Sequence, residues 1–223
     1  MNLPLAAPAA LAAQHEPFLA HFGADLARYF VYFPSLTFAG KLRICLRTDG
    51  IWAIFVYRLG RALASRRRGV LGSLGWAMFE ALEIAVRILT GIHLDVDAAI
   101  GPGFYVGHHG SIVVGPGVRI GRNCNIGQMA LVAQAGPEGR RGTPSIGDRV
   151  FLGAGCKVLG GVTVQDGAAI GANAVVLDDV ARNAVMVGVP ARVVGYGGSR
   201  DHIYLGEGNP PGDGEALLAT STR

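Results

Sequence analysis

A repeat of six residues constrains the fold of this chain more than any other feature. Aliphatic side chains recur at every sixth position, with a two-residue shift after residue 112 and an interruption between residues 132 and 146. All fourteen positions hold Ile, Leu or Val, and eight of them are followed directly by Gly. They are Leu94, Ile100, Val106, Ile112, Val114, Ile120, Ile126, Val132, Ile146, Leu152, Val158, Val164, Ile170 and Val176. A period of six fits neither an amphipathic helix nor a single alternating strand.

A triangular coil satisfies this repeat. If each hexapeptide forms a short strand and a corner, three of them complete one turn of about 18 residues. The aliphatic side chains then fill the prism, and the Gly that follows relieves the backbone at the corner. Successive turns pair in parallel, so that the two ends of the coil are the edges that need a cap. The repeat therefore predicts a mainly-β fold, a parallel β-helix over residues 92–195.

Two further segments flank the predicted coil. Apolar side chains stand at helical spacing over residues 51–63 and 74–89, and Gly91 is a suitable helix stop. Residues 1–91 are therefore predicted to form a small α-helical domain. The sequence after residue 195 is rich in Gly and Pro, which predicts a flexible C-terminal tail over residues 196–223.

Charge and cysteine content limit the partners and the compartment. The formal charge is +4, and the densest basic run, Arg66 to Arg68, has no interleaved aromatic residues, so we expect no nucleic-acid partner. Cys45, Cys124 and Cys156 form an odd set without metal-ligand spacing, which favours a reducing compartment and a cytoplasmic location.

Membrane contact is left open by the sequence. The N-terminus has no basic region ahead of its apolar stretch, so we expect no signal peptide. No run reaches the roughly 18 uncharged residues of a spanning helix. Aromatic and aliphatic residues over 51–90, beside the triple Arg, are nevertheless compatible with a peripheral membrane contact. The simpler interpretation is a helical domain packed on its own trimer.

The repeat and its motifs resemble the hexapeptide-repeat acyltransferases, and within them serine acetyltransferase. The resemblance is carried by Thr90–Ile92, Gly103–Gly115, Pro144–Asp148, Leu152–Gly155, Lys157–Gly160 and Val187–Gly195. It implies a left-handed parallel β-helix, assembly as a homotrimer or a dimer of trimers, and O-acetyltransferase activity with acetyl-CoA as co-substrate and no metal.

The resemblance also implies site residues. His108 matches the catalytic His of the family, and an imidazole is suited to proton abstraction near neutral pH. The acceptor oxygen would then attack acetyl-CoA directly. Ala154 and Ala172 match positions whose backbone binds CoA, while Arg192 and Lys157 are candidates for its phosphates.

The interruption of the coil, residues 133–145, is expected to carry function, because a long excursion in a regular solenoid usually does. In the resembled family this loop reaches a neighbouring subunit and helps to close the active site. Arg140, Arg141 and Thr143 are the candidate substrate-loop residues.

Three positions depart from the serine acetyltransferase pattern. Gly107 replaces an Asp before the catalytic His, and Thr143 replaces a second His. His93 replaces the Asp that orients the catalytic imidazole, and Asp95 is expected to take over that role. Since these groups largely serve amino-acid recognition, the acceptor stays open: a sugar, a polysaccharide or another hydroxyl compound, or L-serine.

Two other functions remain as alternatives. A γ-type carbonic anhydrase shares the β-helix but needs three His ligands for zinc, and the predicted coil holds His93, His108 and His109 with none in its later turns. A non-catalytic trimeric scaffold is the other. Loss of activity in a His108→Ala variant would separate catalysis from both.

Overall fold

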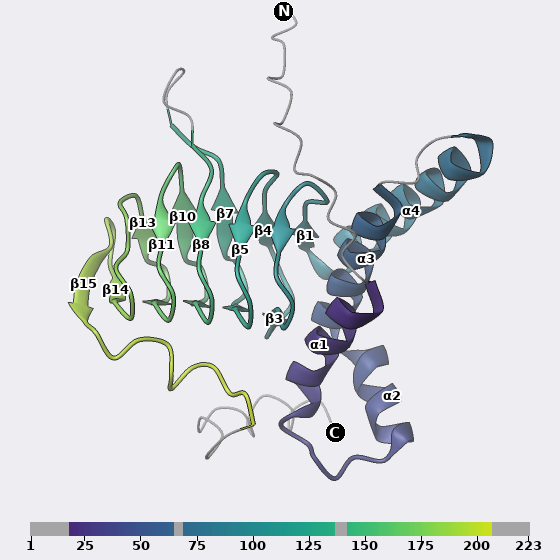
Figure 1. The fold of residues 1–223 in the computed structure, drawn as a ribbon, viewed down its shortest axis with the longest axis horizontal. Helices are drawn as coiled ribbons and strands as arrows, with labels where there is room; N and C mark the ends of the chain where they lie inside the picture. The colour runs from purple at the N-terminus through teal and green to yellow at the C-terminus, as the bar shows by residue number, and fades with distance from the viewer. Residues whose placement is uncertain (1–17, 65–68, 137–141, 207–223) are drawn as a thin grey trace, which may run out of the picture.

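The structure, a computed structural model, describes residues 18–64, 69–136 and 142–206 (Figure 1). Four helices come first: α1 (Phe18–Phe30), α2 (Phe38–Arg47), α3 (Asp49–Ala64) and α4 (Gly69–Thr90). A coil of short strands follows them and extends away from the helices. The predicted fold class, a parallel β-helix preceded by a small helical domain, is confirmed.

The strands of the coil form three sheets, one for each side of a prism. Sheet A contains β1 (Ile92–Leu94), β4 (Ile112–Val114), β7 (Leu131–Ala133), β10 (Lys157–Leu159) and β13 (Val175–Val176). Sheet B contains β2 (Ala99–Ile100), β5 (Arg119–Ile120), β8 (Ser145–Ile146) and β11 (Thr163–Val164). Sheet C contains β3 (Tyr105–Val106), β6 (Asn125–Ile126), β9 (Phe151–Leu152), β12 (Ala169–Ile170), β14 (Val185–Val187) and β15 (Arg192–Gly195).

The aliphatic repeat forms the core of this prism. Every pair of neighbouring strands is parallel except β14 and β15, and the repeat positions stack on one another. Leu94 pairs with Val114, twenty residues later, whereas Val158 pairs with Val176, eighteen residues later. The first turn is therefore two residues longer than a regular one. The additional residues lie in the corner between β3 and β4, which explains the shift of the repeat after residue 112.

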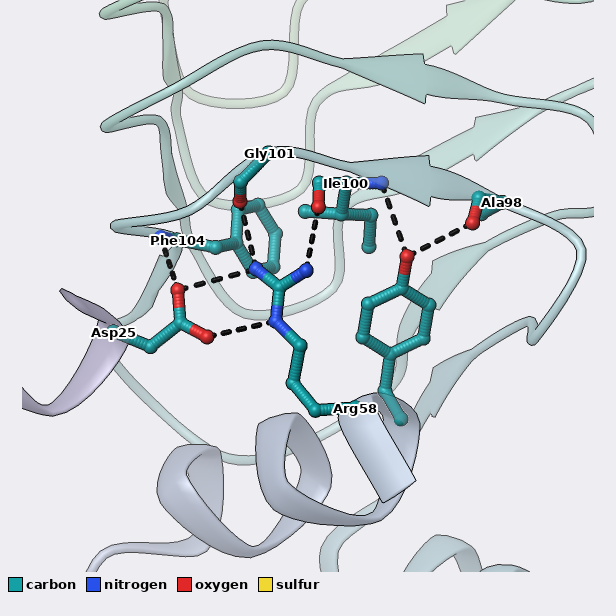
Figure 2. A network of polar contacts seen from close by, with 7 residues as sticks. Asp25, Arg58, Ala98, Ile100, Gly101 and Phe104 are labelled. Carbon is teal, nitrogen blue, oxygen red and sulfur yellow. Dashed lines mark hydrogen bonds and ion pairs between the residues drawn. The ribbon is translucent and has the colours of Figure 1, made fainter. Parts of the chain in front are cut away.

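A buried ion pair joins the helical domain to the first turn of the coil (Figure 2). Arg58 of α3 pairs with Asp25 of α1 at 2.9 Å and donates to the carbonyls of Ile100 and Gly101 at 2.6 and 2.7 Å. Asp25 in turn accepts from the backbone N–H of Phe104 at 2.9 Å. The first turn has no preceding turn to pair with, and these side chains satisfy its open strand edge.

Two tyrosines complete the cap on the same edge. The Tyr57 hydroxyl accepts from the N–H of Ile100 and donates to the carbonyl of Ala98. The Tyr29 hydroxyl makes the same pair of contacts with the N–H and the carbonyl of Val106, both at 3.1 Å. Because buried backbone groups need partners, these contacts fix the helical domain on β2 and β3.

The C-terminal segment closes the other end and then turns back. β15 pairs antiparallel with β14, and residues 196–206 run along sheet C toward α1 (Figure 1). The Ser199 hydroxyl donates to the Arg149 carbonyl at 2.6 Å, and His202 stacks on Phe151 at 4.5 Å between ring centroids. The prediction of a flexible tail from residue 196 is therefore corrected for residues 196–206. Residues 207–223, like 1–17 of the predicted helical domain, lie outside the described residues.

Candidate active site

The wide corner between β3 and β4 carries His108. Two backbone hydrogen bonds hold it, from Gly110 N–H to the Thr90 carbonyl at 2.9 Å and from Met129 N–H to the Gly110 carbonyl at 3.0 Å. The His108 imidazole is half-buried and forms no hydrogen bond or ion pair within the part of the chain that the structure describes. Its ring nitrogens are therefore available to a bound acceptor.

The surroundings of His108 favour its neutral form. Partial burial, and to a smaller extent the positive charge of the neighbouring His109, lower the pKa of His108 from its ordinary value of 6.5. A neutral imidazole is the form that can accept a proton. The corner therefore keeps His108 in the state that a general base needs.

His109 occupies a different environment from His108. Its side chain is 77 % exposed, and its Nδ1 lies 3.5 Å from Oδ2 of Asp49 at the start of α3. This contact places a carboxylate beside the corner. Sequence analysis did not identify Asp49, because the helical domain and the coil come together only in the tertiary structure.

Asp95 does not contact His108 among the described residues. It lies at the end of β1, where its Oδ1 accepts from the N–H of Asp97 at 2.8 Å and its Oδ2 lies 3.8 Å from Nε2 of His93. The corner of His108 precedes β4, the neighbour of β1, so the width of sheet A separates the two positions. The expectation that Asp95 orients His108 is thus not supported within one chain.

His93 stands where the resembled family has the Asp that orients the catalytic imidazole. In this chain the helical domain holds the His93 side chain. Its Nδ1 lies 2.9 Å from Oε1 of Glu83 in α4. Glu83, His93 and Asp95 line a cavity of about 150 Å³ whose other walls include Tyr57 and Phe79. No group of three His, Cys, Asp or Glu side chains suited to a metal ion occurs within residues 18–64, 69–136 and 142–206.

Ala154 and Ala172 lie on the same edge of the prism as His108. The N–H of Gly155 donates to the carbonyl of Gln128, and the N–H of Asn173 donates to the carbonyl of Ala154. These bonds join successive corners that follow β6, β9 and β12, as the His108 corner follows β3. The backbone N–H groups of Ala154 and Ala172 themselves donate no hydrogen bond to any described residue. The edge therefore offers a row of free backbone donors below His108.

Glycines allow these corners to stack. A Cβ atom at Gly127 would lie 2.7 Å from the nitrogen of Ala154, and one at Gly153 would lie 2.9 Å from the nitrogen of Ala172. Side chains at these two positions would force the layers apart. The Gly that follows the aliphatic residue thus keeps the edge narrow, with a spacing of about 4.8 Å between layers.

The two candidate phosphate ligands border the same edge. Lys157 stands on β10, just past the corner, and its Nζ donates to the Gly155 carbonyl at 3.2 Å. Arg192 pairs across the strands with Val187, which packs over Gly171 at the last corner. Its guanidinium lies 3.8 Å from Asp178 and is largely exposed. Lys157 is therefore placed to meet an anion bound along this edge, whereas the Arg192 guanidinium is directed toward Asp178 at the corner that follows β13.

The substrate loop begins on another edge. It leaves the coil after β7 and returns at β8, and Ala135 and Gly142 form an antiparallel bridge at its base. Thr143 packs below Gly117, at the corner between sheets A and B, so it does not line the His108 corner of its own chain. Arg140 and Arg141 lie outside the described residues.

Comparisons with known proteins agree on one family. The profile described as "Bacterial transferase hexapeptide (six repeats)" matches residues 143–178. Serine acetyltransferase of Bacillus licheniformis is 34% identical over 159 residues, which cover 71% of this chain and 70% of the relative. Serine acetyltransferase of Helicobacter pylori strain J99 is 35% identical over 154 residues, covering 69% of this chain and 86% of the relative.

Solved structures show the same similarity. Neisseria gonorrhoeae serine acetyltransferase in complex with serine superposes with a TM-score of 0.65 at 25% identity, covering 80% of this chain and 69% of the other. Brucella abortus strain S19 serine acetyltransferase in complex with coenzyme A superposes with a TM-score of 0.67 at 26% identity, covering 80% and 68%. Together these matches confirm the predicted left-handed β-helix and the predicted enzyme class, an O-acetyltransferase. The chain belongs to the hexapeptide-repeat acyltransferases, in the serine acetyltransferase family.

Proposed function

We propose that this chain transfers the acetyl group of acetyl-CoA to a hydroxyl group of a small acceptor, with His108 as general base. The observation that carries the proposal is the shared edge. A half-buried imidazole with a lowered pKa lies at its first corner, and free backbone N–H groups of Ala154 and Ala172 follow two and three layers below. An extended thioester co-substrate fits this line of donors.

The chemistry follows from a neutral imidazole. His108 accepts the proton of the acceptor hydroxyl while the hydroxyl oxygen forms a bond to the thioester carbonyl carbon. The tetrahedral intermediate then collapses, the carbon–sulfur bond breaks, and CoA leaves as a thiolate that takes up the proton from the imidazolium. A thiol is a good leaving group because its pKa is low. Backbone N–H groups of the corner are candidates to stabilise the oxyanion, since those of His108 and His109 donate to no described residue.

L-serine is the first acceptor to consider, because the relatives are named serine acetyltransferases. Its ammonium group needs a carboxylate, and Gly107 offers none where the family has Asp. Asp49 supports this acceptor, since its carboxylate contacts the corner through His109. We therefore propose Asp49 as the partner of the ammonium group.

A sugar or another uncharged hydroxyl compound is the second candidate. It is favoured by Gly107 and Thr143, which leave the site with fewer charged groups than amino-acid recognition uses. An uncharged acceptor would bind without Asp49. The substitution Asp49→Asn therefore distinguishes the two acceptors.

We also propose that the active site forms between subunits of a homotrimer, or of a dimer of trimers, in the cytoplasm. The edge of His108 and the edge of Thr143 lie on opposite sides of sheet A. A site that uses both needs one edge from each of two copies. Sedimentation equilibrium of the purified chain tests this proposal through the mass of the assembly.

The activity is tested by thiol release from acetyl-CoA with purified protein and a set of acceptors, L-serine beside several sugars. We expect release with at least one acceptor, and a loss of about 10²- to 10⁴-fold in His108→Ala. His109→Ala is the matched control, and it should keep activity within about tenfold. Release that is unchanged in His108→Ala would contradict the role of His108. No release by the wild type with any acceptor would favour a scaffold.

A further inference from the structure

Helix α2 exposes an apolar stripe beside two basic side chains. Phe38, Leu42 and Leu46 follow one another at four-residue spacing, and Phe38 is 83 % exposed. No residue of this helix is buried. Arg43 and Arg47 flank the stripe, are exposed, and have no hydrogen bond or ion pair with any described residue. The helix is thus amphipathic, with its apolar side toward solvent.

Helix α4 exposes a second and longer stripe. Its inner face packs on α3 through Phe79 and Val86. Beside this inner face α4 carries large apolar side chains at three-, four- and seven-residue intervals, which places them in one line along the helix. They are Leu71, Leu74, Met78, Leu82 and Leu89, all exposed, and Val70, Ile84 and Ile88 are exposed on the side of the helix opposite its inner face.

An apolar groove joins the two stripes. Its volume is about 500 Å³, and Leu46 of α2, Phe55 of α3, and Leu82 and Leu89 of α4 all line it. The surface is therefore continuous across three helices. We call it the apolar face and define it as Phe38, Leu42, Leu46, Phe55, Leu71, Leu74, Met78, Leu82 and Leu89. A contiguous apolar surface of this extent marks an interaction site.

Charge indicates what covers the apolar face. Residues 18–91 contain ten Lys and Arg against four Asp and Glu, whereas the whole chain contains 20 and 16. The positive charge of the protein is therefore concentrated in its helical part. The run Arg66 to Arg68 directly precedes α4 in the sequence.

A second copy of the helical part does not complement this charge. All four acidic side chains of residues 18–91 already have partners within the chain. These pairs are Asp25 with Arg58, Asp49 with His109, Glu80 with Trp76, and Glu83 with His93. Two copies that met through this face would bring two positively charged helical parts together. An anionic lipid surface supplies both the counter-charge and the apolar phase.

We propose that the apolar face lies in the headgroup and acyl boundary of an anionic membrane, with Arg43 and Arg47 at lipid phosphates. By length and composition alone α4 could cross a membrane, and 11% of its most apolar window is buried. It lies on the surface instead, because Phe79 and Val86 pack on α3 and Glu83 is bonded to His93 of the coil. The protein is thus a peripheral membrane enzyme. This inference does not depend on the identity of the acceptor.

Co-sedimentation of the full chain with vesicles tests the proposal. We expect binding to vesicles of phosphatidylglycerol and phosphatidylcholine, weaker binding to phosphatidylcholine alone, and weakening with added salt. Arg43→Gln/Arg47→Gln should bind the anionic vesicles about 25-fold more weakly, at about fivefold for each basic residue. Leu42→Glu/Leu74→Glu should lose binding to both kinds of vesicle.

The matched control is Arg119→Gln/Arg122→Gln, which removes the same charge from exposed positions of the coil. It should retain the binding of the wild type. The proposal is wrong if the wild type stays in the supernatant with anionic vesicles. It is also wrong if sedimentation velocity shows that Leu42→Glu/Leu74→Glu converts a larger assembly into a smaller one, since a second copy would then cover the face. Circular dichroism checks that the variants are folded.

Discussion

Nδ1 of His109, the residue that directly follows His108, lies 3.5 Å from Oδ2 of Asp49. The corner thus holds two imidazoles in different environments. His108 is half-buried and has no partner among the described residues, while His109 is exposed and faces a carboxylate. His109 also contributes to the lowered pKa of His108.

The pH dependence of catalysis follows from this pair. A general base works in its neutral form, so kcat/KM should rise as pH increases through the pKa of His108. Since that pKa is lowered from 6.5, the midpoint of the acidic limb should lie below 6.5. The substitution His109→Gln removes the positive charge that helps to lower the pKa of His108, so the midpoint should move to higher pH. A midpoint that stays in place or moves to lower pH would contradict the assignment.

Bulky residues on the shared edge should obstruct acetyl-CoA. We expect Ala172→Trp to raise the KM for acetyl-CoA at least about tenfold, equivalent to about 1.4 kcal/mol. Stability should change little, because Ala172 is exposed. Ala181→Trp is the control at an exposed corner of another edge. Equal KM values in the two variants would place the co-substrate elsewhere.

The role of Asp95 is open to a direct test. Its carboxylate contacts the N–H of Asp97 and faces His93, so Asp95→Asn should leave kcat within about twofold and the acidic limb of the pH profile unchanged. If kcat falls by about 10² or more in a folded variant, Asp95 does orient His108 in the assembled enzyme.

The ion pair between Arg58 and Asp25 should dominate the docking of the helical domain. Each side chain is at most 2% exposed, so Arg58→Met or Asp25→Asn should lower the free energy of unfolding by about 3–5 kcal/mol. Arg182→Met, which breaks the exposed pair with Asp166 at 2.8 Å, should cost at most about 1 kcal/mol. Urea denaturation measures both variants. Equal losses would mean that the buried pair does not hold the domains together.

The coil and its first corner were determined by the sequence alone. An aliphatic residue at every sixth position predicts which residues pack on it, because each turn of the coil stacks on the next in the same register. The positions of Leu94, Val114, Val158 and Val176 in one column therefore followed without knowledge of the rest of the chain. His108, Ala154 and Ala172 were predicted from the resemblance to the hexapeptide-repeat acyltransferases, and the repeat places them on one edge of the prism.

The tertiary structure alone decided the contacts between segments that are distant in sequence. Asp49 and Glu83 come from helices whose docking on the coil depends on Arg58, Asp25 and Tyr57, and no periodicity encodes that arrangement. The Gly- and Pro-rich composition after residue 195 did not reveal that residues 196–206 lie against sheet C. The helical spacing in α4 predicted an apolar face, but not which apolar face stays exposed, because burial depends on the neighbour that packs there. The repeat therefore fixed the scaffold and the place of the His108 corner in it, and the packing of the helices decided which polar groups surround that corner.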